Sequence, residues 1–494
     1  MKNRIIASLL ALLLAAGSLV SCESEAADDG SAVTTAGDTA AVETTAAEET
    51  QLRDKVPELN FNGADFSILM RTNMNHEFNA TAENGEPVND AVFRRNNKIA
   101  QRFNITFNMI EEEGTWATQS NFLGKIKNNV SAGDASYDLI AGYCAYISTL
   151  ASDGYYYNWR DINYIDFTAP WWNQVLINET EINGQLHFMS GDLAISGIQN
   201  AICLFYNKNL WTNYQFEDPY ELVRSGKWTI DKMQSFTTQA YQDLDGDGQY
   251  SDGDQYGYVT DTHNLVDAYQ AALQAPALVR GDDGVPTLVI QEEKFLSAYA
   301  KIYDLLLGQK STYTGFDQAD TPENLYRPIF DQGRALIVPE WLGNAEILRS
   351  LEFDFGILPL PKYDEAQDGY HTISQDSFSL FCVPSVVKDI DMIGAVTEAL
   401  ACESRNSVIP AFYEVALKSK YARDEGSEEM IDLINNSLYY DFSTVHIVAL
   451  NKPTHSWRLQ LIAKSENLVS YIESQMKVYT KSLEKLLESY SDAE

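Results

Sequence analysis

The sequence predicts an α/β protein with two or more lobes and a helical C-terminal region. Strand-like and helix-like segments alternate between residues 65 and 141, which is typical of a parallel sheet with right-handed crossovers. The 494 residues are too many for one compact core, so at least two lobes are expected. From Met392 onward the pattern is mostly helical.

The first half of the chain supplies the alternating elements. Apolar runs predict strands, and apolar side chains at helical spacing, such as Val92, Ile99 and Phe103, predict helices. The strands are expected over 65–70, 105–110 and 137–141, and the helices over 89–103 and 116–130. Ligands bind beyond the carboxyl ends of parallel strands, so the loops after Met70 and Ala141 are the first candidate sites.

The second half has fewer strand-like runs. Strands are expected over 201–206, 335–338 and 353–358, and helices over 229–242 and 466–487. One face of the last helix carries an apolar stripe made of Leu468, Ile472, Met476, Tyr479, Leu483 and Leu487. The stripe is shorter than four heptads, so packing onto a lobe is expected rather than a coiled coil.

The first 22 residues have the layout of a secretory signal. Lys2 and Arg4 precede an apolar run over 5–16, which is too short to span a bilayer as a mature helix. The ending Leu-Val-Ser-Cys22 resembles the lipobox of bacterial lipoproteins. That resemblance implies cleavage after residue 21 and lipidation of Cys22, and the alternative is an ordinary signal peptide with a chance cysteine.

Residues 22–56 are expected to form a disordered linker. The segment is rich in Glu, Asp, Ala and Thr and has no aromatic residue, so it cannot bury enough apolar surface to offset the entropy of ordering. Like charges extend such a linker away from the lipid surface. The structured part is expected to begin near Leu59.

Composition excludes several classes of partner. The chain has 71 Asp and Glu against 35 Lys and Arg, a net charge of -36, which repels nucleic-acid phosphates and anionic head groups. No later run is long and apolar enough to be a transmembrane span. The widely spaced cysteines Cys144, Cys203, Cys382 and Cys402 match no metal motif and are expected to be buried free thiols, although an exported protein can also pair them.

Four segments together resemble the extracellular solute-binding proteins of sugar-type ABC importers. They are Ala-Gly-Asp leading into Tyr-Asp-Leu-Ile (132–140), Leu-Phe-Tyr-Asn-Lys-Asn-Leu (204–210), Phe-Asp-Gln-Gly-Arg-Ala-Leu followed by Trp341 (330–341) and Phe-Gly-Ile-Leu-Pro-Leu-Pro-Lys (355–362). Each segment is a weak signal alone. Their order and spacing over residues 59–400 are what identify the family.

The resemblance implies a periplasmic-binding-protein-like fold of two α/β lobes joined by crossing strands. Lobe one is expected to contain 57–195 and 337–378, and lobe two 196–336 and 379–494. A ligand is then expected in the cleft, which closes by a hinge motion. The helical end past Met392 is longer than in the simplest members of the family.

The resemblance also supplies candidate ligand-binding residues, which follow predicted strands or lie near crossovers. Apolar C–H faces of sugars stack on aromatic rings, while sugar hydroxyls need polar partners. The candidates are Arg71, Asn73, Tyr143, Tyr146, Asp192, Trp341, Gln375 and Asp376. Arg71 can instead pair with a surface carboxylate, and Trp171-Trp172 can be either a stacking platform or a helix start anchored in the core.

Residues 243–254 match an EF-hand-type calcium loop. Alternating carboxylates converge on a hard cation, and Gly248 permits the sharp turn. The expected ligands are Asp243, Asp245, Asp247, the backbone carbonyl of Gln249 and Asp254, which replaces the usual Glu. Helix-then-strand flanks favour a structural site over a sensor, and the alternative is a solvated acidic turn.

Catalytic motifs are missing from the sequence. There is no HExxH motif, nucleophile elbow, P-loop or dinucleotide fingerprint, although abundant carboxylates leave a glycosidase pair open. Together with these missing motifs, the resemblance implies a monomeric, non-enzymatic substrate-binding protein of an ABC importer. It is expected to be lipid-anchored outside the cytoplasm, to capture a carbohydrate of the oligosaccharide class, and to dock on permease subunits. The alternatives are a secreted carbohydrate-active enzyme, a surface adhesin or signalling module, and a peptide or other polar solute as ligand.

Overall fold

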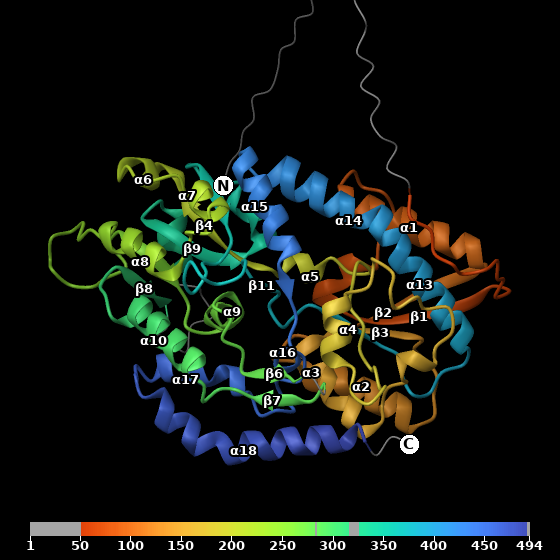
Figure 1. The fold of residues 1–494 in the computed structure, drawn as a ribbon. Coiled ribbons are helices and arrows are strands. Elements are labelled where there is room, and N and C mark those ends of the chain that lie inside the picture. The colour runs from red at the N-terminus through yellow and green to blue at the C-terminus, as the bar shows by residue number, and fades with distance from the viewer. Residues whose placement is uncertain (1–50, 282–283, 316–325, 492–494) are drawn as a thin grey trace, which may run out of the picture. The chain divides into compact units, whose positions relative to one another are not determined.

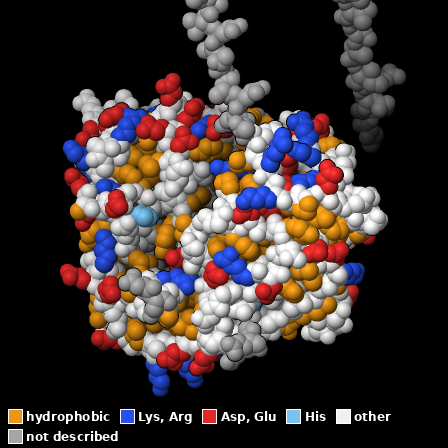
Figure 2. Space-filling model, turned by 45° about the vertical axis from the view of Figure 1, so that its right-hand side comes forward, with side chains coloured by type: hydrophobic (Ala, Val, Ile, Leu, Met, Phe, Trp, Pro, Cys, Tyr) orange, Lys and Arg blue, Asp and Glu red, His pale blue; other side chains and the backbone are white. Residues whose placement is uncertain are grey.

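A computed structural model describes residues 51–281, 284–315 and 326–491 (Figure 1). The predicted signal (1–21), Cys22 and the linker up to residue 50 lie outside the described residues. Within the described ranges, every helix is too short or too polar to cross a membrane. On the face drawn in Figure 2, basic side chains lie interspersed among acidic ones.

One mixed sheet carries the alternating elements of the first part of the chain. Its strands, in spatial order, are β12 (Ser379–Cys382), β3 (Leu139–Tyr143), β1 (Ala64–Arg71) and β2 (Ile105–Glu112). Strand β1 pairs in parallel with β2 and β3, and β12 is antiparallel to β3. We call this sheet, with the helices α1 (Pro87–Phe103), α2 (Gln119–Ser131), α3 (Cys144–Ile147), α4 (Gln174–Thr180) and α13 (Ile390–Asn406), the first lobe.

Strand β1 is buried on both faces of this sheet: its successive side chains point to opposite sides and join two different cores. Phe66, Ile68 and Met70 of β1 join the core that contains residues of α1 and α13. Leu69 points the other way and joins a second core with Phe122 of α2. The centre of the sheet is therefore covered on both faces, and its strand ends are the places where ligands can reach it.

A second mixed sheet forms the second lobe. Its strands, in spatial order, are β10 (Phe355–Leu358), β4 (Ile202–Asn207), β9 (Ala335–Trp341), β5 (Tyr256–Thr260) and β8 (Thr312–Thr314). Strand β4 is antiparallel to both β10 and β9, whereas β5 is parallel to β9 and β8. One large apolar core surrounds this sheet.

Short helices flank the second sheet, and the C-terminal helices extend its core. The first group is α6 (Lys208–Asn213), α7 (Pro219–Arg224), α8 (Ile230–Gln239), α9 (Asn264–Ala272), α10 (Glu293–Leu307), α11 (Tyr326–Asp331) and α12 (Ala345–Leu348). The second group is α14 (Val408–Pro410), the π-helix η6 (Ala411–Tyr421), α15 (Glu425–Asn436), α16 (Phe442–Val445), α17 (Ser456–Ile462) and α18 (Leu468–Ser489). Two strand pairs complete the fold, β6 (Leu278–Arg280) with β7 (Pro286–Leu288) and β11 (Thr372–Ile373) with β13 (Leu438–Tyr439).

The predicted strands and long helices all form, with ends within three residues of those expected. The last helix, α18, packs against α10 and α17, as its apolar stripe predicts. At its other end Tyr490 lies 5.5 Å, between ring centroids, from His187. Cys144, Cys203, Cys382 and Cys402 are buried free thiols, which confirms that expectation.

The predicted lobe boundaries are wrong at the second crossover. Segment 337–378 was expected in lobe one, yet β9 and β10 pair with β4 in the second lobe. Segment 379–494 was expected in lobe two, yet β12 pairs with β3 and α13 packs against α1 in the first lobe. The reason is that antiparallel partners are chosen by non-local pairing, which the apolar pattern of one strand does not encode.

The linker also ends earlier than predicted. Val56 is buried in the first lobe, and Arg102 of α1 forms two hydrogen bonds, of 2.6 and 2.7 Å, with the carboxylate of Asp54. Leu52 donates its backbone N–H to the side chain of Asn406. One apolar anchor and one bidentate ion pair therefore order residues well before Leu59.

A buried glutamate on α13 makes the stability of the first lobe pH-dependent. Glu398 is fully buried and accepts a hydrogen bond of 2.8 Å from Trp172 Nε1. Burial raises the pKa of Glu398 to about 7, although the Trp172 bond opposes the shift. The folded state therefore holds this proton after the unfolded chain has released its own, so the free energy of unfolding falls as pH rises from the usual glutamate range to about 7.

We predict that Glu398→Gln raises the free energy of unfolding at pH 8 by about 2–3 kcal/mol and changes it little at pH 4.5, because the neutral amide avoids burying a charge. Urea unfolding at both pH values measures the difference. Glu473→Gln, an exposed change on α18, is the control and is expected to change the free energy of unfolding by less than about 0.5 kcal/mol. An equal effect of Glu398→Gln at both pH values would contradict the prediction.

Candidate functional site

Strand ends from both lobes meet along one crossover segment, residues 373–379. Ser374 bridges to Ala201 next to the start of β4, and Gln375 donates its backbone N–H to the carbonyl of Asn200. Further along, the carbonyl of Asp376 accepts from the N–H of Ala145, just after β3. The segment thus runs from the second lobe to the first and brings their strand ends together.

An aromatic and polar cluster occupies the first-lobe side of this junction. The ring of Tyr143 lies 5.1 Å from that of Tyr146 and 6.2 Å from that of Trp116, between centroids. The hydroxyl of Tyr143 donates to Asp376 at 3.1 Å, and Arg71 Cζ lies 5.3 Å from the centroid of the Tyr143 ring. Burial raises the pKa of Tyr143, so it is a neutral donor at physiological pH.

Arg71 lies beneath this cluster rather than at its surface. The side chain is 1% exposed, and its Nη2 donates to Ser379 Oγ at 3.2 Å. Burial lowers the pKa of Arg71, and the nearby charge of Glu77 opposes that shift. Arg71 therefore contacts the Tyr143 ring from its buried side, and it forms no surface ion pair with any of the described residues.

Trp116 offers the accessible aromatic face of the cluster. It is 42% exposed, and the Nζ of Lys452 lies 5.0 Å from the centroid of its ring. Lys452 belongs to the segment between α16 and α17, and both it and Asn451 have positive φ angles, 63° and 61°. This contact joins the first lobe to the helical C-terminal region.

A small pocket of about 40 Å³ adjoins the cluster. Its lining includes Asp376 on the crossover, Asp267 on α9 and Arg458 on α17. Arg458 donates to Asp267 from Nε at 3.1 Å and also from Nη2. Burial raises the pKa of Asp267 to about 6, although Arg458 opposes the shift.

The candidate ligand residues divide by position. Five candidates lie in the cluster, joined by ring contacts and by hydrogen bonds such as that from Gln375 Nε2 to Asp376. They are Arg71, Tyr143, Tyr146, Gln375 and Asp376. Trp341, 36% exposed, pairs through its backbone with Ile202, which lines the pocket.

Two other candidates do not join the cluster by any contact seen in the described residues. Asn73 is exposed in the turn after β1. Asp192 forms an ion pair of 3.2 Å with Arg405 and lines a different pocket. Trp171 and Trp172 are buried in the first-lobe core, so they anchor the chain there and offer no stacking platform.

Sequence reasoning did not select Trp116, Asp267, Lys452 or Arg458 as site residues. Trp116 follows β2, so the strand-end rule that selected Tyr143 would have selected it too. The other three come from helices or helix connections of the second lobe. No local motif marks them.

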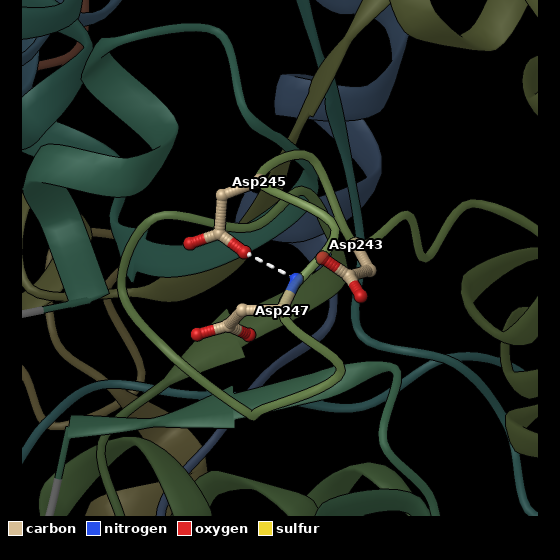
Figure 3. A group of neighbouring side chains, drawn as sticks. All are labelled: Asp243, Asp245 and Asp247. Carbon is tan, nitrogen blue, oxygen red and sulfur yellow. Dashed lines mark hydrogen bonds between the residues drawn. The ribbon is translucent and has the colours of Figure 1, made fainter.

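The predicted calcium loop lies between α8 and β5 (Figure 3). Asp243, Asp245 and Asp247 are exposed, and one carboxylate oxygen of each lies within 4.8 Å of those of the other two. Asp243 accepts the N–H groups of Gly246 and Gly248, at 2.7 and 2.9 Å, which lower its pKa. Three carboxylates are therefore held together at one end of the loop.

The remaining predicted calcium ligands lie further along the loop. Gln249 donates its backbone N–H to Asp247 at 2.6 Å. Asp254 is buried and accepts from the N–H of Leu244 at 3.2 Å and from the hydroxyl of Tyr241 at 3.3 Å. Its carboxylate thus points back toward the start of the loop without joining the group of three.

Comparisons with known proteins identify the fold. No protein-family model and no curated protein matches the chain. Among solved structures, an ABC substrate-binding protein of Listeria monocytogenes in complex with cycloalternan matches at a TM-score of 0.55 and 12% identity, over 85% of this chain and 99% of that one. The chain shares the fold of ABC substrate-binding proteins.

Two further structures with this fold match to a similar degree. A cyclic alpha-maltosyl-1,6-maltose binding protein of Arthrobacter globiformis has a TM-score of 0.55 and 13% identity, over 85% of this chain and 99% of that one. The protein UgpB of Mycobacterium tuberculosis in complex with glycerophosphocholine has a TM-score of 0.54 and 14% identity, over 86% and 99%. The predicted two-lobe α/β fold is confirmed.

We predict that Arg458→Met lowers the free energy of unfolding by about 3–5 kcal/mol at pH 8, because it leaves the carboxylate of Asp267 buried without its partner. The loss is expected to be smaller at pH 5, where Asp267 accepts a proton. Urea unfolding at both pH values measures it.

The matched control is Arg94→Met, which breaks the exposed pair with Glu83. Its expected cost is below about 1 kcal/mol. A loss for Arg458→Met that is the same at pH 5 and pH 8 would contradict the role assigned to Asp267.

Proposed function

We propose that this chain is the substrate-binding component of an ABC importer and captures a carbohydrate between its two lobes. The observation that carries the proposal is the exposed Trp116 ring beside Tyr143 and Asp376, at the junction of strand ends from both lobes. Sugar rings stack on aromatic faces, and carboxylates accept hydrogen bonds from sugar hydroxyls. Structures of the same fold hold cycloalternan and other oligosaccharides, which supports the ligand class.

Each residue has a distinct part in this proposal. Trp116 stacks on one sugar ring. Lys452 moves off the face of the Trp116 ring when the ligand arrives. Asp376 and Gln375 hydrogen-bond the sugar hydroxyls, while Arg71 holds Tyr143 in place. Contacts from both lobes favour the closed arrangement, because a ligand shifts a conformational equilibrium only through interactions that differ between the two states.

The proposed anchor follows from the sequence alone. Lipidation of Cys22 would tether the chain to the outer face of the cell membrane, and the acidic linker would give the folded part reach toward permease subunits. The chain would act as a monomer outside the cytoplasm, as a binding protein rather than an enzyme.

We predict that the full chain binds at least one oligosaccharide of a panel containing hexose and pentose oligomers, measured by isothermal titration calorimetry. Trp116→Ala is expected to weaken binding of that sugar about tenfold, because the stacking surface is lost. Tyr164→Ala, another exposed aromatic truncation, is the control and should leave the affinity unchanged. Steady release of products from the sugar would instead establish the alternative of a carbohydrate-active enzyme.

We also propose that the loop over 243–254 holds a structural calcium ion. The support is a set of oxygen donors that suits a hard cation, Asp243, Asp245 and Asp247, with ligand atoms close together on an exposed loop. Gly246 and Gly248 have φ angles of 73° and 72°, which glycine adopts without strain and which let the loop turn sharply. The ion would offset the repulsion among these carboxylates.

We predict that calcium raises the melting temperature by about 3–5 °C over an EDTA-treated sample, because it binds only the folded loop. Asp245→Ala is expected to abolish this rise. Asp252→Ala removes an exposed carboxylate from the same loop at a position without a ligand role, so it should keep the rise. A full calcium effect in Asp245→Ala would refute the site.

A further inference from the structure

The C-terminal helices contact both lobes at two edges of the molecule. At one edge the π-helix η6 packs against α1 of the first lobe and against α12 and α15 of the second. At the other, α18 packs against α10 and α17 of the second lobe and against the 3-10 helix η2 (Ser148–Asp153) of the first. Figure 1 shows α14 and α18 at opposite edges, with α5 (Ser196–Gln199) and β11 between them. A rotation of the lobes about one edge therefore has to separate the contacts at the other.

The two edges differ in how the lobes are joined. At the first edge the chain itself is continuous, because α13, α14, η6 and α15 follow one another from the first lobe into the second. Hinges are a few backbone positions that absorb a rotation while the chain stays intact. At the other edge α18 meets the first lobe through side chains, and such contacts can separate. The α18 edge is therefore the one that has to part when the lobes move apart.

Tyr490, directly after α18, fixes this edge to the first lobe. It is 3% exposed, and its ring centroid lies 5.5 Å from that of His187 and 6.0 Å from that of His446. The segment that follows His187 bridges to β12 of the first-lobe sheet. Beside the ring, Asn183 donates to Ser491 Oγ at 3.2 Å. The Tyr490 hydroxyl has no hydrogen-bond partner among the described residues, so the packing of the ring makes this anchor.

Arg280 of β6 makes a second contact between the lobes on the same side. Its Nη1 donates to the carbonyls of Asn178 and Glu179 at 2.5 and 2.8 Å, and its Nη2 donates to the carbonyl of Glu181 at 2.9 Å. These carbonyls lie at the C-terminal end of α4 in the first lobe, where helix C=O groups lack partners within the helix and a cation is favoured. Arg280 Nε also donates to the carbonyl of Gly284 at 2.9 Å, which holds the guanidinium against its own strand pair. The helix α16 packs against both β6 and α4, and Figure 1 shows β6 and β7 next to α18.

We propose that α18 and the β6–β7 pair form a strap that holds the two lobes together, with Tyr490 and Arg280 as its anchors, and that the strap must detach before the cleft opens. Neither anchor lines the pocket, and neither contacts the aromatic cluster in the described part of the chain. The strap therefore shifts the balance between closed and open arrangements without touching a ligand, because that balance depends on every contact that differs between the two states. The inference goes beyond the proposed carbohydrate function and does not depend on it.

The test measures the distance between spin labels on the two lobes by double electron–electron resonance, in the full chain dialysed free of ligand. The labels are attached at exposed positions, Lys127→Cys on α2 and Ala300→Cys on α10, in a Cys22→Ser background, since the other four cysteines are buried. This parent is expected to give one main distance. In the double variant Tyr490→Ala, Arg280→Met, a distance longer by more than about 2 Å is expected to be at least about tenfold more populated than in the parent. Arg280→Met alone gives a smaller change of the same sign and serves if the double variant does not fold.

The matched control is Tyr490→Phe, Arg224→Met. It keeps the anchoring ring and breaks the exposed pair of Arg224 with Glu429, which lies within the second lobe, so the parent distance should be retained. An unchanged distance in the double variant, with both anchors removed, overturns the strap. A longer distance that is equally populated in the control, or that already dominates in the parent, overturns it as well.

Discussion

The buried carboxylate of Glu77 joins the three segments from which the site is built. It accepts hydrogen bonds from the backbone N–H of Ser196 at 2.8 Å and from Ser379 Oγ at 2.5 Å, and Arg71 donates to that same serine. Arg95 donates to the backbone carbonyl of Glu77 at 2.9 Å. These bonds fix three segments to one another in a region that excludes water: the turn after β1, the chain at Ser196 before β4, and the start of β12.

This junction determines where the polar side chains of the cleft can lie. Asp376 stands three residues before Ser379, so anchoring that serine holds Asp376 within reach of Tyr143. Buried charges at such a junction stabilise the fold less than their attraction alone suggests, because desolvation offsets much of that attraction. Burial lowers the pKa of Arg95 to about 10, which is the effect expected of such desolvation.

Sequence reasoning recovered the part of the site that obeys a local rule. Arg71 and Tyr143 are the last residues of parallel strands, and ligands gather at such ends, so their place in the cluster was foreseeable. The place of Asp267 and Arg458 in the site was not foreseeable. The two residues are 191 positions apart, and each lies on a helix with no motif. Asp192 shows the opposite error, because closeness to a crossover in sequence did not bring it to the cluster.

The sequence by itself determined the local features of this protein: the strands and helices, the apolar stripe of α18 and the loop that groups Asp243, Asp245 and Asp247. Those features depend on periodicity and on neighbours a few residues apart, which a single chain displays directly. Only the tertiary structure decided that β12 joins the first sheet and that Lys452 and Arg458 face the junction. The physical reason is that strand pairing and contacts between lobes are chosen by competition among distant segments, which no local pattern records.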